Sequence, residues 1–272
     1  GQYTRNECYF DNNPEMKASG LPNKEVKSIL LKLREKHGAS FVPKTTLTKP
    51  VGAPGQGQSL DNNIKIANAL LDSAGWKVEA DGIRSKNGKR MVIKLVLSSP
   101  LFQRIIEPYK NNLKKIGLSL DVKVVQIAKY EEILRNFNFD MVVANYPQSR
   151  SPGNEQRSMW SSEAESTAGS RNYMGIKNPA IDELIDRIVE AKSRKELINS
   201  IQAMDRILTH QFYIVPNWYI PYDRIVYWNK FSRPKINPSQ SIIINNILEW
   251  WWFDESKATT LKKARASGSA LQ

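Results

Sequence analysis

The pattern of apolar and polar positions predicts an alternating series of strands and helices in the middle of the chain. Residues 91–97 alternate like a strand, residues 118–125 form a second strand, and residues 139–144 form a third that is almost wholly apolar. Helices are predicted between them, over residues 100–116 and 128–137. Because parallel strands need crossover connections, which are usually helices, this alternation predicts parallel pairing and an α/β lobe.

Further amphipathic helices are predicted on both sides of this series. They are expected over residues 22–38, 61–75, 179–192 and 194–209. Asp61 is the expected N-cap of the second of these helices, because a carboxylate accepts hydrogen bonds from free backbone N–H groups. Residues 213–216 and 225–228 are strand-like, and a tryptophan-rich stretch at residues 250–253 leads to a short final helix.

The stretch from residue 145 to residue 175 has no clear periodicity and is far longer than the usual α/β connection. It leaves the end of a buried strand, where open α/β sheets place their ligand crevice, so we interpret it as a ligand-binding loop in preference to a mobile surface loop. The candidate contacts are Tyr146, Gln148, Ser149, Asn154, Arg157, Trp160, Arg171 and Tyr173. Core packing is the alternative role for the aromatic residues, and capping of the loop itself is the alternative for the polar ones.

The charge composition of the chain bears on whether it binds nucleic acid. The chain has 272 residues, 40% of them hydrophobic, and a formal net charge of +13. Such a charge is compatible with nucleic-acid binding, but Lys and Arg alternate with Glu and Asp along the predicted helices, which is typical of solvated helix faces. No nucleic-acid partner is therefore expected.

The single cysteine limits the kinds of site that the chain can form but does not decide its compartment. Cys8, the single cysteine, excludes an internal disulfide or a Cys-x-x-Cys site, and we expect a partly buried thiol. No run of about 18 apolar residues is present, so no membrane span is predicted. The chain begins at Gly1 without an initiator Met or an apolar signal core, which suggests a processed or truncated start.

Signatures of catalysis are sparse. The two histidines, His37 and His210, both lie at ends of predicted helices, and neither belongs to a metal-binding His pair. No serine-nucleophile elbow or phosphate loop is present, and no cofactor or metal site is expected. Binding without chemistry fits better, with Arg157 or Arg171 able to hold a carboxylate in bidentate geometry. A peptide- or sugar-acting hydrolase and a basic nucleic-acid or membrane-surface module stay open as alternatives.

Several short motifs, in this order and spacing, carry a resemblance to a known family. They are residues 67–76 (ANALLDSAGW), 81–82 (DG), 113–118 (LKKIGL), 138–141 (NFDM), 171–173 (RNY) and 178–185 (NPAIDELI). With them the chain resembles the peptide- and oligopeptide-binding proteins of ABC importers, whose two lobes close on a ligand. Residues 151–157, 169–173 and 218–224 are similar to the subgroup associated with microcin C uptake.

The resemblance implies a fold, partners and a compartment. The implied fold is α/β, a periplasmic-binding-protein type II-like lobe with a C-terminal segment that returns to the first lobe. Residues 1–57 are then an extension between lobes, residues 58–212 the second lobe, and residues 213–272 the returning segment. The implied protein is not an enzyme; it is periplasmic, captures an oligopeptide or modified peptide, and delivers it to an ABC permease in the inner membrane.

Two departures from the family pattern lead to further expectations. Family members are roughly twice as long, so this chain looks like the C-terminal half, and we expect the N-terminal half of the same protein to pair with it as a separate chain. Dipeptide binders hold the ligand's free amine with an aspartate, where this chain has Gln148. A longer, modified or cell-wall-derived peptide is therefore expected in place of a simple dipeptide.

Overall fold

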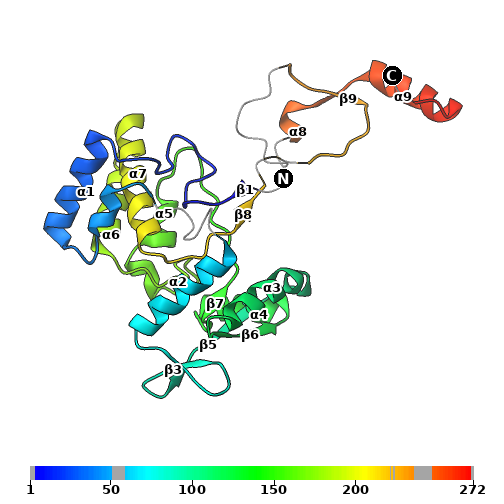
Figure 1. The fold of residues 1–272 in the computed structure, drawn as a ribbon. Coiled ribbons are helices and arrows are strands. Elements are labelled where there is room, and N and C mark those ends of the chain that lie inside the picture. The colour runs from blue at the N-terminus through cyan, green and yellow to red at the C-terminus, as the bar shows by residue number, and fades with distance from the viewer. Residues whose placement is uncertain (1–3, 51–58, 221, 223, 236–246, 271–272) are drawn as a thin grey trace. The chain divides into compact units, whose positions relative to one another are not determined.

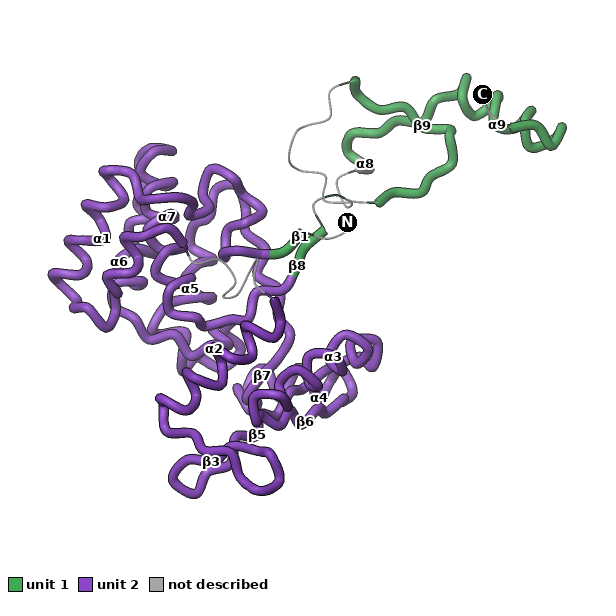
Figure 2. The backbone as a smooth tube through the Cα atoms, viewed as in Figure 1, with its two compact units in different colours: residues 1–5, 218–272 green, residues 6–217 purple. Residues whose placement is uncertain are grey.

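The computed structural model describes residues 4–50, 59–220, 222, 224–235 and 247–270 (Figure 1). Figure 2 shows that the chain forms two units: unit 1 combines Gly1–Arg5 with Trp218–Gln272, and unit 2 is Asn6–Asn217. These boundaries differ from the domain boundaries expected at residues 57/58 and 212/213, which stay a prediction about the lobes of the whole protein.

A three-stranded parallel sheet organises the middle of unit 2. Its strands, in the order β6-β5-β7, are β5 (Val92–Leu97), β6 (Ser119–Val124) and β7 (Met141–Val142). β5 pairs in parallel with both neighbours. The connections contain η2 (Pro100–Phe102), α3 (Gln103–Lys114) and α4 (Ile127–Arg135). The predicted parallel strands and crossover helices are confirmed, although β7 is shorter than the strand expected over residues 139–144.

A small apolar core lies between this sheet and α3. Because successive side chains of a strand point to opposite faces, Leu95 and Leu97 share one face of β5. They pack with Leu120 of β6 and Ile106 of α3, and all four side chains are buried. β7 belongs to this sheet and is therefore fixed to the core. The predicted ligand-binding loop begins at the end of β7.

Before the sheet lie one helix and a small antiparallel meander. They are α2 (Leu60–Ser73), β2 (Lys77–Val78), β3 (Arg84–Lys86) and β4 (Lys89–Arg90). The predicted helix is confirmed, but Asp61 is not its N-cap. Ser59 caps it instead, with its hydroxyl oxygen accepting a hydrogen bond from the Asn62 N–H at 3.2 Å, because the helix begins at Leu60 and places Asp61 inside its first turn.

Arg84 ties α2 to the sheet. Its side chain is buried and donates hydrogen bonds to Asn68 Oδ1 at 2.8 Å, Asp72 Oδ1 at 2.6 Å and the Ile116 carbonyl at 2.8 Å. Gly117 follows with a φ of +76°, and a Cβ at that position would lie 2.6 Å from Arg84 Cγ. The turn before β6 therefore needs a glycine both for its backbone angle and for the space that Arg84 occupies.

The other part of unit 2 is helical. Its elements are α1 (Lys24–His37), η1 (Lys44–Leu47), α6 (Pro179–Val189) and α7 (Arg194–His210). α7 contacts α1, α6 and η1, and most of its C-terminal half is buried. Figure 1 shows α7 beside α1 and α6. The helices predicted over residues 22–38, 179–192 and 194–209 are thus confirmed within a few residues at their ends.

Residues before α1 pack onto this helical part. Phe10 and Met16 are fully buried in its core. The buried carboxylate of Asp205, on α7, accepts hydrogen bonds from the backbone N–H groups of Tyr9 at 2.9 Å and Ala18 at 2.8 Å. Cys8 is buried, more completely than expected, and burial raises the pKa of its thiol far above the ordinary value.

Among its described residues, unit 1 has two short strand pairs and two helices. They are β1 (Thr4–Arg5) with β8 (Trp218–Tyr219), β9 (Phe231–Ser232) with β10 (Trp252–Phe253), α8 (Ile247–Trp250) and α9 (Glu255–Ser267). The final helix is confirmed. The strands predicted over residues 213–216 and 225–228 are wrong. Pro216 cannot donate to a strand ladder, and an apolar run such as that of residues 225–228 forms a strand only where a partner strand lies alongside.

Candidate ligand-binding site

The loop that leaves β7 is an ordered platform. It contains α5 (Glu155–Trp160) and η3 (Glu163–Glu165), where the sequence predicts no regular structure. A helix of six residues spans less than two turns, too few for a helical period to be visible in the sequence. A long connection over residues 145–175 is therefore confirmed, but it contains two short helices that the sequence pattern does not indicate.

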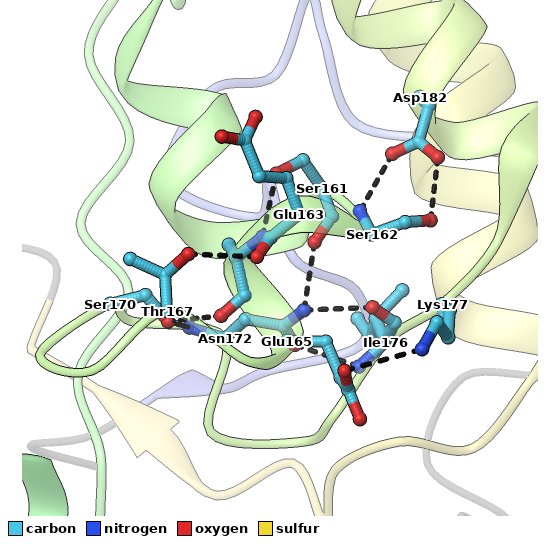
Figure 3. A network of polar contacts seen from close by, with 11 residues as sticks. Ser161, Ser162, Glu163, Glu165, Thr167, Ser170, Asn172, Ile176, Lys177 and Asp182 are labelled. Carbon is cyan, nitrogen blue, oxygen red and sulfur yellow. Dashed lines mark hydrogen bonds and ion pairs between the residues drawn. The ribbon is translucent and has the colours of Figure 1, made fainter.

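Asn172 holds the second half of this loop together (Figure 3). Its side-chain amide donates to the carbonyls of Ser161 at 3.0 Å and Ile176 at 2.8 Å, and its Oδ1 accepts from the Ile176 N–H at 2.8 Å. The Asn172 side chain is fully buried, so these bonds form without competition from solvent. One side chain thereby fixes the distance between two turns of the loop.

Asp182 joins the same loop to α6. Its carboxylate accepts from the Ser162 N–H at 2.7 Å and from the Ser162 hydroxyl at 2.5 Å, as Figure 3 shows. Lys177 and Glu165 form an ion pair at 3.5 Å nearer the surface of this network. The platform is thus attached to the helical part as well as to the end of the sheet.

Five aromatic side chains form a continuous row across the platform. Tyr146 and Trp160 are stacked, with ring centroids 4.9 Å apart and an interplanar angle of 30°. Edge contacts extend the row from Trp160 to Tyr9 at 5.2 Å, from Tyr146 to Tyr173 at 6.3 Å, and from Tyr173 to Phe139 at 6.2 Å. These separations are those of favourable aromatic pairs, so the row is a stiff cluster, in which Phe139, Tyr146 and Tyr173 are partly exposed.

Sequence reasoning missed two members of this row, Tyr9 and Phe139. Phe139 is the first residue of the third predicted strand, and nothing in the sequence marks it as part of a site. Tyr9 is separated from Trp160 by a long stretch of chain, and no local pattern indicates that they meet. Their contribution arises from tertiary packing.

Gln148 and Trp160 are linked by buried hydrogen bonds through Gln156. Trp160 is fully buried, and its indole N–H donates to Gln156 Oε1 at 2.7 Å. Gln156 in turn donates to Gln148 Oε1 at 2.8 Å, and the Gln148 carbonyl accepts from the Asn12 side chain at 2.9 Å. Both candidates therefore have internal partners in this conformation, and direct contact of either with a ligand stays a prediction.

Ser149, Asn154 and Arg157 are exposed and lie away from the row's own contacts. The Ser149 carbonyl accepts from the Asn13 side chain at 3.5 Å. Asn154 Oδ1 accepts from Arg157 Nε at 3.1 Å, and Arg157 Nη2 forms an ion pair with Asp186 Oδ1 at 2.8 Å. The structure thus brings Tyr146, Trp160, Arg171 and Tyr173 together and places Asn154 and Arg157 beside α6.

Arg171 lies against Tyr146. Its guanidinium carbon is 5.4 Å from the centroid of the Tyr146 ring, and Nη2 donates to the Asn145 carbonyl. The Tyr146 hydroxyl donates to the Arg171 carbonyl at 3.0 Å. Burial raises the pKa of Tyr146 well above its ordinary value, so the phenol stays a neutral hydrogen-bond donor. Tyr146, Arg171 and Tyr173 are each partly exposed and form the accessible part of the site.

The two histidines lie at helix ends, as predicted. His37 ends α1 and contacts Glu183 at 3.0 Å, while His210 ends α7 and is buried. Burial and, secondarily, the neighbouring Arg206 lower the pKa of His210 below its ordinary value. In the part of the chain that the structure describes, no three His, Cys, Asp or Glu side chains gather as a metal site, and none of the helices is long and apolar enough to cross a membrane.

This fold is that of a lobe of the periplasmic binding proteins of type II. It is similar to the structure of the oligopeptide-binding protein AppA of Bacillus subtilis in complex with a nonapeptide, with a TM-score of 0.56 at 20% sequence identity, covering 86% of this chain and 49% of that one. At this identity the likeness concerns the fold alone.

The sequence then identifies the family within this class. Residues 19–168 match the sequence profile of the bacterial extracellular solute-binding proteins, family 5 (middle region), which is more than half of the chain. The chain belongs to this family of solute-binding proteins.

Two curated relatives come from Agrobacterium fabrum. The chain is 31% identical to the probable peptide-binding protein YejA, over 89% of this chain and 39% of that protein. It is 29% identical to the peptidoglycan-binding protein YepA, over 88% of this chain and 38% of that protein. The chain thus spans well under half the length of these relatives.

Proposed function

We propose that this chain is part of the solute-binding component of an ABC importer that captures oligopeptides or modified peptides between two lobes and delivers them to a membrane permease. Membership of the extracellular solute-binding family supports a binding role without catalysis. The names of the two relatives, which refer to peptide and peptidoglycan binding, support a peptide or a peptide of cell-wall origin as the ligand. The compartment that fits this role is the periplasm.

The observation that carries this proposal is the aromatic row at the end of β7. Ligand sites in proteins are mostly apolar surfaces with a few well-placed polar groups. Tyr146 and Tyr173 are each partly exposed, and Trp160 stacks on Tyr146. Parallel α/β sheets present ligands at the carboxyl ends of their strands, and Tyr146 follows the carboxyl end of β7.

Gln148 supports a ligand other than a free dipeptide. Its side chain is buried and its Oε1 accepts from Gln156 at 2.8 Å. An uncharged amide with an internal partner offers no anion to the ammonium group of a dipeptide. A longer or modified peptide, held along its backbone and side chains, is consistent with this chemistry.

The lobe assignment is part of the same proposal. Residues 58–212 would belong to the second lobe and residues 213–272 to the segment that returns to the first. Unit 1 exposes several large apolar side chains, among them Val226, Trp228, Trp252 and Phe253, which a soluble protein normally covers. The N-terminal half of the same protein is the proposed cover for them.

The paired-half proposal predicts that a tag on this chain isolates a second polypeptide in equal amount. Peptide mass fingerprinting would then identify that polypeptide as the product of the sequence directly upstream of this chain. Recovery of this chain in the same purification without such a partner would contradict the proposal.

Isothermal titration calorimetry with the whole protein tests the binding role. Tri- to octapeptides are expected to bind with dissociation constants of about 1 μM, near −8 kcal/mol. Tyr146→Ala should weaken binding at least about 10-fold by removing a partly exposed aromatic side chain that the ligand contacts. Tyr109→Ala, on α3 of the sheet core, should not alter the affinity of the folded fraction. Failure of every peptide to bind, or hydrolysis of the peptide during the titration, would contradict the proposal.

A further inference from the structure

The two arginines that are candidates for holding a carboxylate differ in their partners. Arg157 already pairs with Asp186, at 2.8 Å. For Arg171, no Asp or Glu carboxylate of the described residues lies within 4.0 Å of the guanidinium. Of the two, only Arg171 therefore has its charge available for an anion that comes from outside the chain.

Arg171 is also held in place before any ligand arrives. Its backbone N–H donates to the Ser158 carbonyl at 2.9 Å, and its own carbonyl accepts from the Tyr146 hydroxyl at 3.0 Å. The guanidinium contacts the Tyr146 ring and uses one N–H on the Asn145 carbonyl. A guanidinium has five N–H donors in a planar fork, so donors remain for a second acceptor. Immobilisation in advance reduces the entropy cost of binding.

The surroundings strengthen an ionic contact at this place. The Tyr146 ring covers one side of the guanidinium and keeps water from that side, which lowers the local dielectric constant. The site therefore offers a cation beside an apolar ring, the opposite of what an ammonium group requires.

We propose that Arg171 binds a carboxylate of the captured peptide, either its C-terminal carboxylate or an acidic side chain, against the ring of Tyr146. This inference rests on the proposed peptide-binding function and specifies which charged group of the peptide the site recognises. The fork of Arg171 matches a carboxylate in two parallel N–H···O bonds, which an amide of the same shape cannot accept as well. The site thus selects anionic peptides.

The test compares peptides that differ in one group. Each of a set of tri- to pentapeptides is prepared in two forms, one with a C-terminal carboxylate and one with a C-terminal amide. For each peptide that contains Asp or Glu, a second peptide carries Asn or Gln at that position. Calorimetry with the whole protein should show the carboxylate form binding about 10- to 100-fold more tightly, as expected for a charge-assisted hydrogen bond. In Arg171→Gln this ratio should fall to about 1, and in Arg171→Lys, which keeps the charge but loses the fork, it should be intermediate.

A matched control removes the positive charge of another arginine, outside the proposed site. Arg187→Gln acts on α6, where Arg187 pairs with Glu183 at 3.1 Å, and should leave the ratio unchanged. A substitution that only disturbed the fold would weaken both forms of a peptide equally. The ratio therefore reports on carboxylate recognition independently of stability.

The outcomes separate this inference from the proposed function. Binding of both forms with equal affinity, or a ratio that Arg171→Gln leaves intact, would overturn the role of Arg171 while peptide binding stood. Binding of neither form by the wild-type protein would overturn the peptide-binding function itself and this inference with it.

Discussion

The side chain of Arg84 is buried and joins α2 to the sheet by hydrogen bonds. A buried cation is tolerated only when its donors are satisfied, and Arg84 reaches Asn68 and Asp72 on α2 as well as backbone carbonyls. Asn68 and Asp72 both belong to the motif at residues 67–76 that carries the family resemblance. The polar residues of that motif thus have a structural role, because they accept hydrogen bonds from Arg84.

The turn at Gly117 provides a sharp test of this arrangement. Gly117→Ala should lower the free energy of unfolding by about 2–6 kcal/mol, because a left-handed backbone angle costs a non-glycine residue about 1–3 kcal/mol and overpacking adds a similar amount. Gly88→Ala is the matched control, with a φ of +74° but no atom within 4 Å of the new Cβ. It should cost only the backbone part, so equal losses in urea unfolding would contradict the packing argument.

At the scale of elements, the predictions succeeded where a segment is long and periodic. β5, β6, α6 and α7 each show their period over enough residues to be identified, and the structure has them close to the predicted positions. α5 was missed because less than two turns of helix leave no visible period. The strands predicted over residues 213–216 and 225–228 are absent because a short apolar run does not show whether a partner strand is present.

The candidate site was predictable only in part, for a similar reason. The length and position of the loop after β7 indicate a site, and Tyr146, Trp160, Arg171 and Tyr173 do come together there. The buried positions of Gln148 and Trp160 depend on Gln156 and on residues near the start of the chain. Contacts of this kind arise from tertiary packing and leave no local signal in the sequence.

The platform depends on Asn172, which gives a prediction at the element scale. Asn172→Ala removes three hydrogen bonds at a fully buried position and leaves the backbone groups of Ser161 and Ile176 without those partners. We expect a loss of about 2–4 kcal/mol of stability, from about 1–3 kcal/mol for each orphaned buried group with partial relaxation. Limited proteolysis should show faster cleavage within residues 161–177.

The control for this prediction lies in the same loop. Thr167→Ala removes an exposed hydroxyl that donates to the Glu163 carbonyl at 2.8 Å and should change stability by less than about 0.5 kcal/mol. An Asn172→Ala variant as resistant to protease as the Thr167→Ala variant would show that the platform does not need the Asn172 bonds.

At the scale of the whole molecule, the two units have different surfaces. Unit 2 has its own buried core around α7, whereas unit 1 exposes aromatic side chains such as Trp228 and Trp252. A large apolar surface of this kind is costly in water. This contrast supports the proposal that unit 1 is completed by the N-terminal half, while unit 2 carries the aromatic row.

Native mass spectrometry of the whole protein, isolated from its source, tests the central claim most directly. The account predicts that the protein carries a bound peptide, which collisional activation releases and fragmentation identifies by its amino-acid sequence or cell-wall-type cross-link. Tyr146→Ala should be isolated with much less of it. A protein isolated with a ligand of another chemical class, or a Tyr146→Ala variant that retains the peptide in full, would contradict peptide capture at this aromatic row.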